Sequence, residues 1–151
     1  MKLTRRNLIK LGAGASVVGL AGSWNPLLAS DDGLVMATIP SSGERVPAVG
    51  IGTNKFRGDV GSADMAPLRA TLETFFERGG RVIDTSPNYG NSEQVLGHLL
   101  AESGLRGQAF MATKVDREDR EAGLERMAGS QQRLGGVLDL MQVHNLRGTD
   151  V

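Results

Sequence analysis

Segments with the length of β-strands alternate with helix-like segments along most of this chain of 151 residues, and that alternation limits its fold more than any other feature. Short apolar runs, each suited to a buried strand, lie at residues 46–52, 81–85, 109–115 and 137–143. Segments with apolar residues at helical spacing lie between them, at 66–78, from Ser92 to Gly104, and at 116–133. Because strands that alternate with helices form parallel sheets with right-handed crossovers, we expect an α/β fold.

Local signals predict where these helices begin and end. The apolar face of the first helix is formed by Leu68, Leu72, Phe75 and Phe76. Asp64 is its expected N-cap, and Gly79 and Gly80 are expected to end it. Ser92 is the expected cap of the second helix.

Two other segments carry mixed signals. Gly123 and Gly129 interrupt the third helical segment, whose apolar positions are Leu124, Met127 and Leu134. The run at 46–52 follows an expected turn at 41–44 and contains Pro47, which fits best at the start of a strand. We therefore expect a single strand there.

Periodicity leaves two parallel architectures open, a doubly wound sheet and a piece of a (β/α)₈ barrel, and residues at the strand ends favour the barrel. Asp84 ends one strand, Lys114 lies near the end of the next, and His144 follows the last. Tyr89, the only tyrosine, lies in the loop after Asp84. In a barrel, the carboxyl ends of the strands meet at one mouth, where chemistry takes place.

Together these four residue types suit the protonation of a carbonyl while a cofactor delivers hydride. A phenol, with an ordinary pKa near 10, is a weak proton donor at neutral pH, and a neighbouring ammonium lowers the pKa of a phenol. A carboxylate would hold the ammonium, and a histidine can hydrogen-bond a carbonyl oxygen. Taken singly, Asp84, Tyr89 and His144 also fit structural roles, whereas Lys114 in an apolar strand needs a partner. His98, within an apolar helical pattern, is expected to be structural.

The motifs around these residues resemble those of the aldo-keto reductase family. Residues 79–93 are similar to the family signature around its catalytic Asp and Tyr, 112–115 to its lysine strand, 134–145 to its histidine strand, and 46–54 to its opening strand. The resemblance covers about residues 43–147 and implies a partial (β/α)₈ TIM barrel containing about its first four β/α units. On this basis residues 31–151 are the N-terminal half of such a barrel.

By this resemblance the chain is an NADPH-dependent oxidoreductase that reduces an aldehyde or ketone to an alcohol. Tyr89 would be the general acid, Lys114 the group that tunes it, Asp84 the partner of Lys114, and His144 the residue that orients the carbonyl. The positions that match cofactor contacts are Gly52, Thr53, Asn54 and Asp84. We expect no metal site.

The sequence also departs from the family pattern. The family barrel has eight strands and only four are counted here, so the chain is expected to be incomplete and to lack most of the cofactor site. The alternative is an inactive truncated remnant or a non-catalytic binding or assembly protein. Ser86 and Pro87 replace the commoner small residue and variable loop after the aspartate. A different exported barrel, such as a hydrolase, would need a carboxylate pair or metal ligands, and the strand ends offer one acid.

The first 30 residues resemble a twin-arginine signal peptide. Residues 4–10 contain Arg5 and Arg6 in the expected pattern, and the uncharged run from Leu11 to Gly22 is too short for a stable membrane span. A basic helical anchor or tail is the alternative. The pattern predicts export to the periplasm or beyond by the Tat machinery, and it excludes residues 1–30 from the fold.

Charge and cysteine content exclude other classes. The 17 basic and 17 acidic residues cancel, so the chain lacks the excess of positive charge that is typical of nucleic-acid-binding proteins. The chain has no cysteine, which excludes disulfides, thiolate metal sites and a cysteine nucleophile.

Overall fold

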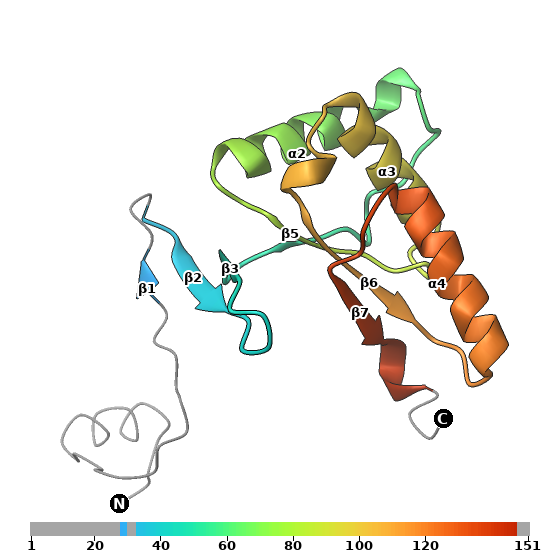
Figure 1. Cartoon of the computed structure of the whole chain (residues 1–151). Coiled ribbons are helices and arrows are strands. Elements are labelled where there is room, and N and C mark those ends of the chain that lie inside the picture. The colour runs from blue at the N-terminus through green and yellow to red at the C-terminus, as the bar shows by residue number, and fades with distance from the viewer. Residues whose placement is uncertain (1–27, 30–32, 148–151) are drawn as a thin grey trace, which may run out of the picture.

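The structure is a computed structural model that describes residues 28–29 and 33–147. The proposed signal sequence therefore lies outside the described residues, except for Leu28 and Ala29. The described part contains two sheets, one antiparallel with three strands and one parallel with four. In Figure 1 the α-helices lie along one side of the parallel sheet.

The parallel sheet confirms the predicted α/β fold. Its strands, which are hydrogen-bonded in chain order, are β4 (Ile51–Gly52), β5 (Val82–Asp84), β6 (Phe110–Val115) and β7 (Leu140–Val143). The connecting helices are α2 (Ala66–Glu77), α3 (Ser92–Glu102) and α4 (Arg120–Leu134). Each neighbouring pair of strands is parallel, and the register places Gly52 beside Asp84 and Lys114 beside Gln142. The carboxyl ends of the strands therefore lie along one edge.

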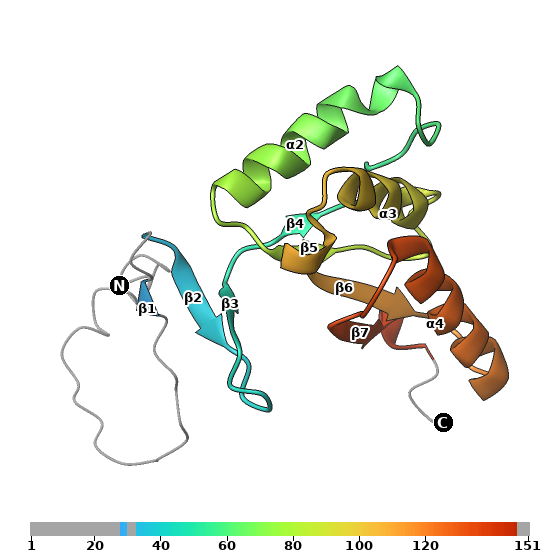
Figure 2. The same ribbon diagram turned by 45° about the horizontal axis from the view of Figure 1, so that its top comes forward.

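A small antiparallel sheet precedes the parallel one and was not expected from the sequence. It is formed by β1 (Leu28–Ala29), β2 (Val35–Thr38) and β3 (Arg45–Pro47), in that order. In both views it lies beyond the amino ends of the parallel strands, away from α4 (Figures 1 and 2). The turn predicted at 41–44 joins β2 to β3, and the Ile39 amide donates to the Glu44 carbonyl at 2.8 Å.

The single strand predicted at 46–52 is therefore wrong, because the run is divided between the two sheets. Pro47 ends β3 instead of starting a strand, which suits a residue without an N–H to donate. The chain then passes close to β5 at Gly50, where an added Cβ would lie 2.7 Å from the Val82 carbonyl oxygen. It continues as β4, which pairs with β5 in parallel.

The core lies between the parallel sheet and its helices. Its fully buried side chains share an aliphatic character and include Leu72, Ile83, Val95, Leu96, Leu99, Leu100, Met111 and Leu134. The apolar face predicted for α2 is thus directed inward, and its Leu68, Phe75 and Phe76 pack against the core. Burial of each such side chain contributes on the order of 1.5–3 kcal/mol.

Two predicted helix caps are wrong. Asp64 lies in a short 3₁₀ helix, η2 (Ala63–Met65), and Met65 is the N-cap of α2. Asn91 is the N-cap of α3, and Ser92 is its first residue, with its hydroxyl buried under the strand ends. The predicted end of α2 is correct, since Gly79 follows the helix at φ 79°, a conformation that favours glycine.

The third helix forms despite its glycines, but its buried face differs from the prediction. Asp119 caps α4 by accepting from the Ala122 amide at 2.9 Å. Leu134 is buried as expected, whereas Leu124 is 48% exposed. Gly123 and Ser130 complete the buried face, where Ser130 Oγ donates to Glu93 of α3 at 3.2 Å.

Candidate active site

Asp84 and Lys114 form an ion pair at the carboxyl ends of β5 and β6. Lys114 Nζ donates to the two carboxylate oxygens of Asp84 at 2.6 and 2.8 Å, and to the Thr85 carbonyl oxygen at 2.8 Å. These three acceptors match the three donors of an ammonium. The Lys114 side chain is 12% exposed, so the pair satisfies a charge that would be costly to bury alone.

Tyr89 and His144 adjoin this pair. Lys114 Nζ lies 5.1 Å from the centroid of the Tyr89 ring, within the range of a cation–π contact. The Tyr89 and His144 rings meet edge to face, with centroids 6.1 Å apart and an interplanar angle of 87°. The structure therefore brings all four predicted residues together. No described residue hydrogen-bonds the Tyr89 hydroxyl.

Buried hydroxyls tie the strand ends together beneath these residues. The amide and hydroxyl of Thr53 donate to the Asp84 carbonyl oxygen at 3.1 and 2.9 Å. Ser92 Oγ donates to the Thr53 carbonyl oxygen at 2.9 Å and lies 3.2 Å from Thr85 Oγ1. These contacts join β4, β5 and α3. Sequence reasoning missed this role of Ser92 because it interpreted the residue as a cap.

Gln142 is a further polar residue that the sequence analysis missed. It lies on β7 beside Lys114, and its Nε2 donates to Asp84 Oδ1 at 2.9 Å. Its position two residues before His144 was the available signal, because alternate residues of a strand face the same side. The carboxylate of Asp84 therefore receives hydrogen bonds from two residues, Lys114 and Gln142.

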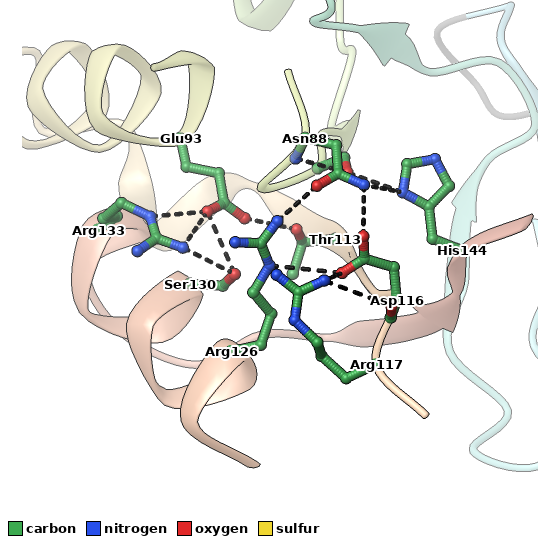
Figure 3. Close-up of polar contacts among 10 residues, drawn as sticks. Asn88, Glu93, Thr113, Asp116, Arg117, Arg126, Ser130, Arg133 and His144 are labelled. Carbon is green, nitrogen blue, oxygen red and sulfur yellow. Dashed lines mark hydrogen bonds and ion pairs between the residues drawn. The ribbon is translucent and has the colours of Figure 1, made fainter. Parts of the chain in front are cut away.

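The loop after β5 contacts His144 and the loop after β6 (Figure 3). Ser86 Oγ lies 3.1 Å from His144 Nδ1, and Asn88 Nδ2 lies 3.4 Å from the same atom. Asn88 Nδ2 donates to Asp116 Oδ2 at 2.7 Å. This hydrogen bond holds the pKa of Asp116 below its ordinary value, Arg117 adds to the effect, and partial burial opposes it. Sequence reasoning did not identify Asn88 or Asp116.

Three of the four residues proposed to contact a cofactor lie at the end of β4, and the fourth, Asp84, ends the neighbouring strand β5. Gly52 is exposed and pairs with Asp84 in the sheet, and an added Cβ at Gly52 would meet no atom within 4 Å. Thr53 is buried and bound to Asp84 as described. Asn54 is exposed, and its Oδ1 accepts from Arg57 Nη2 at 3.0 Å.

Other features lie away from this cluster. His98, on α3, is 3.3 Å from Glu102, whose pKa is lowered mainly by its hydrogen bond to Arg69. An apolar hollow of about 610 Å³, lined in part by Val49 and Phe75, lies between the antiparallel sheet and α2, near the amino ends of the strands. Among the described residues, no group of three His, Asp or Glu side chains is arranged to hold a metal ion.

Comparison with known proteins identifies the family. The sequence model of the Aldo/keto reductase family matches residues 48–150. The chain belongs to the aldo/keto reductase family. An aldo-keto reductase from Mycolicibacterium vanbaalenii is 32% identical over 103 residues, which cover 66% of this chain and 34% of that protein. Aldo-keto reductase YhdN from Bacillus subtilis is 30% identical over 121 residues, which cover 71% of this chain and 37% of that protein.

Solved aldo/keto reductases confirm the partial barrel fold. The structure of an aldo-keto reductase from Klebsiella pneumoniae in complex with NADPH aligns at a TM-score of 0.58 and 27% identity, covering 74% of this chain and 40% of that one. The chain spans about a third of the length of the curated relatives named above. In the part that the structure describes, no helix combines the length and apolar composition needed to cross a bilayer.

Proposed function

We propose that this chain carries the catalytic residues of an NADPH-dependent reductase that converts an aldehyde or ketone to an alcohol. Membership of the aldo/keto reductase family supports an oxidoreductase. The observation that carries the proposal is the ion pair of Lys114 with Asp84, placed at 5.1 Å from the centre of the Tyr89 ring and beside His144.

In this proposal Tyr89 is the proton donor. Its hydroxyl has no hydrogen-bond partner among the described residues and is therefore free to meet a carbonyl oxygen. Lys114 places a positive charge against the phenol ring, which stabilises the phenolate left after the proton has moved. Asp84 and the Thr85 carbonyl hold that ammonium in place. His144 hydrogen-bonds the carbonyl oxygen and orients it toward Tyr89.

The residues at the end of β4 fit one end of a nicotinamide cofactor. A flat ring needs close access to the backbone, and the open space beside Gly52 provides it next to Asp84. Asn54 and the carboxylate of Asp84, whose side chain is 40% exposed, offer polar groups to an amide or a ribose. NADPH, when bound, supplies the hydride, and the Klebsiella pneumoniae relative in complex with NADPH supports that choice.

Export by the twin-arginine pathway is part of the proposal and rests on the sequence alone. The pair Arg5–Arg6 precedes an uncharged segment of the length typical of a signal peptide. The reductase would then act in the periplasm or outside the cell.

Transfer of a label tests the proposed reaction directly. A complete barrel that contains this chain is incubated with an aldehyde and NADPH deuterated at the transferable position of the nicotinamide, and the alcohol is analysed by mass spectrometry. We expect one deuterium on the carbinol carbon, and none with a variant in which Lys114→Met and Tyr89→Phe are combined. An unlabelled product, or no product from that barrel before substitution, would contradict the proposed activity.

A further inference from the structure

The side-chain amide of Asn88 lies among three charged or titratable groups (Figure 3). Its Oδ1 accepts from Arg126 Nη2 of α4 at 2.5 Å, and its Nδ2 donates to Asp116 Oδ2 at 2.7 Å. Nδ2 also lies 3.4 Å from His144 Nδ1. Asn88 directly precedes Tyr89, so the amide joins the loop of the proposed proton donor to the proposed carbonyl-orienting residue.

The orientation of this amide is set by its partners. A guanidinium only donates hydrogen bonds, so Arg126 requires the amide oxygen. An ionised carboxylate only accepts, so Asp116 requires the amide nitrogen. Asp116 is held ionised because its pKa is lowered by the bond from Asn88 and by Arg117 and Arg126. Rotation of the amide by 180° would place its nitrogen against the Arg126 guanidinium, so that two donors would meet. The amide oxygen would then face the Asp116 carboxylate, so that two acceptors would meet.

An amide oriented in this way presents an N–H to the ring of His144. Both hydrogen-bond contacts of that ring with described residues use Nδ1, one from Asn88 and one from Ser86. The Ser86 hydroxyl already accepts the Asn88 backbone N–H at 3.1 Å, and its own proton remains free to point at the ring. A hydroxyl can donate or accept, whereas the amide nitrogen can only donate. Asn88 therefore decides which form of the ring is favoured, and Ser86 follows.

We infer that Asn88, fixed by Asp116 and Arg126, is a positioning residue that keeps Nδ1 of His144 unprotonated and the ring proton on Nε2. The purpose of this arrangement rests on the proposed function, since an Nε2–H can donate to a carbonyl oxygen and a bare Nε2 cannot. Asn88 acts through His144 and does not itself contact the reacting atoms. The arrangement belongs to the loop in which this chain departs from the family pattern.

Imidazole ¹⁵N chemical shifts test the inference without any activity measurement. The chain has two histidines, so a His98→Gln background leaves His144 as the single ring signal. The spectra are recorded about two units above the ordinary histidine pKa of ~6.5, where a ring is neutral. The decisive variant exchanges the two partners, Asn88→Asp together with Asp116→Asn. It conserves the net charge and their mutual hydrogen bond but places a carboxylate opposite Nδ1.

We expect Nδ1 of the parent to have the shift of an unprotonated ring nitrogen, and Nδ1 of the exchanged variant to have the shift of a protonated one. Asn88→Ala, at an exposed position where folding is little affected, is expected to give an intermediate shift as both tautomers become populated. Ser86→Ala should leave Nδ1 unprotonated, and Ser103→Ala, on the far end of α3, should change nothing.

A protonated Nδ1 in the parent, or an unchanged shift in both Asn88 variants, would overturn the inference. A protonated Nδ1 in Ser86→Ala would also overturn it, because the determinant would then be the hydroxyl. These outcomes concern the ring alone, so they remain separate from any failure of the deuterium-transfer experiment, which tests the proposed reductase activity.

Discussion

The carboxylate of Glu93, which is 2% exposed, lies 2.7 Å from the Arg133 guanidinium, and the two residues belong to different helices. Glu93 also accepts from Thr113 Oγ1 at 2.7 Å and from Ser130 Oγ at 3.2 Å (Figure 3). This buried carboxylate thus joins the first turn of α3 to β6 and α4. Because that turn directly follows the Tyr89 loop, the same contacts fix the end of the loop.

Replacement of Glu93 by Gln is expected to lower the free energy of unfolding by about 2–3 kcal/mol. The amide keeps the shape of the side chain, but it offers one acceptor oxygen and places an N–H among donors. Urea denaturation followed by circular dichroism measures the loss. Glu102→Gln, which removes an exposed acid paired with Arg69, is the matched control and should leave stability unchanged. Equal effects of the two substitutions would contradict a special role for the buried carboxylate.

Gly97 of α3 lies close to the backbone at the end of α4. An added Cβ would lie 1.9 Å from the Arg133 carbonyl oxygen and 3.3 Å from the Leu134 Cα, so the backbone itself would have to move. We expect Gly97→Ala to lower the unfolding free energy by at least about 1 kcal/mol, even though alanine favours helices. Gly107→Ala adds the same methyl group where no atom lies within 4 Å, and thermal melting should show little change.

Asp116 is expected to contribute to the pH dependence of stability. Its folded-state pKa is lower than the ordinary value of 3.8, first because of the Asn88 hydrogen bond. A lowered carboxyl pKa stabilises the folded state fully above the unfolded-state value, and this contribution is lost as the pH falls through the folded-state value. The stability difference between the parent and Asp116→Asn should therefore be constant above about pH 5 and shrink below pH 3.8. Thermal melts across that interval measure it, and a difference that grew on acidification would have the wrong sign.

The sequence predicted the regular part of the fold and the clustering of Asp84, Tyr89, Lys114 and His144 for the same reason. Buried parallel strands are continuous apolar runs, so an ionisable residue at the end of such a run is conspicuous, as Asp84 and Lys114 are. Alternation of strands and helices then places those ends at one edge. The antiparallel strand β2 was missed because it is short and half-exposed. The end of β3, the buried pair Val46 and Pro47, was assigned to the single strand at 46–52 because its apolar residues continue into that run.

Polar contacts between distant segments were beyond the reach of pattern reasoning. Asn88 and Asp116 are 28 residues apart, and each alone is an ordinary loop residue. Ser92 was misassigned because a serine before an apolar helix has the same local pattern whether its hydroxyl caps the helix or binds a neighbouring strand. Glu93 likewise shows its role only through the Arg133 contact, 40 residues away.

The proposed export predicts a clear effect of a conservative change at the N-terminus. Arg5→Lys combined with Arg6→Lys preserves the charge of the segment and removes the arginine pair. We expect the precursor to stay in the cytoplasm of a Tat-competent bacterium, as judged by fractionation and immunoblotting. Lys2→Arg is the control and should not alter export. Export that continued at the parental level in the double variant would exclude the twin-arginine route.

The Tyr89 hydroxyl is the group on which the proposed chemistry depends. Tyr89→Phe keeps the ring that lies against Lys114 and His144 and removes only the proton donor, so packing and the Asp84–Lys114 ion pair should persist. A general acid contributes roughly 10²- to 10⁴-fold in rate, so in a complete barrel that contains this chain the turnover of an aldehyde should fall by at least about 10²-fold. NADPH affinity should change little, because Tyr89 is not among the residues proposed to contact the cofactor. Steady-state kinetics and fluorescence titration measure the two quantities at matched circular dichroism. If turnover stayed within a few-fold of the parent, Tyr89 would not be the proton donor, and the positive charge of Lys114 would need another explanation.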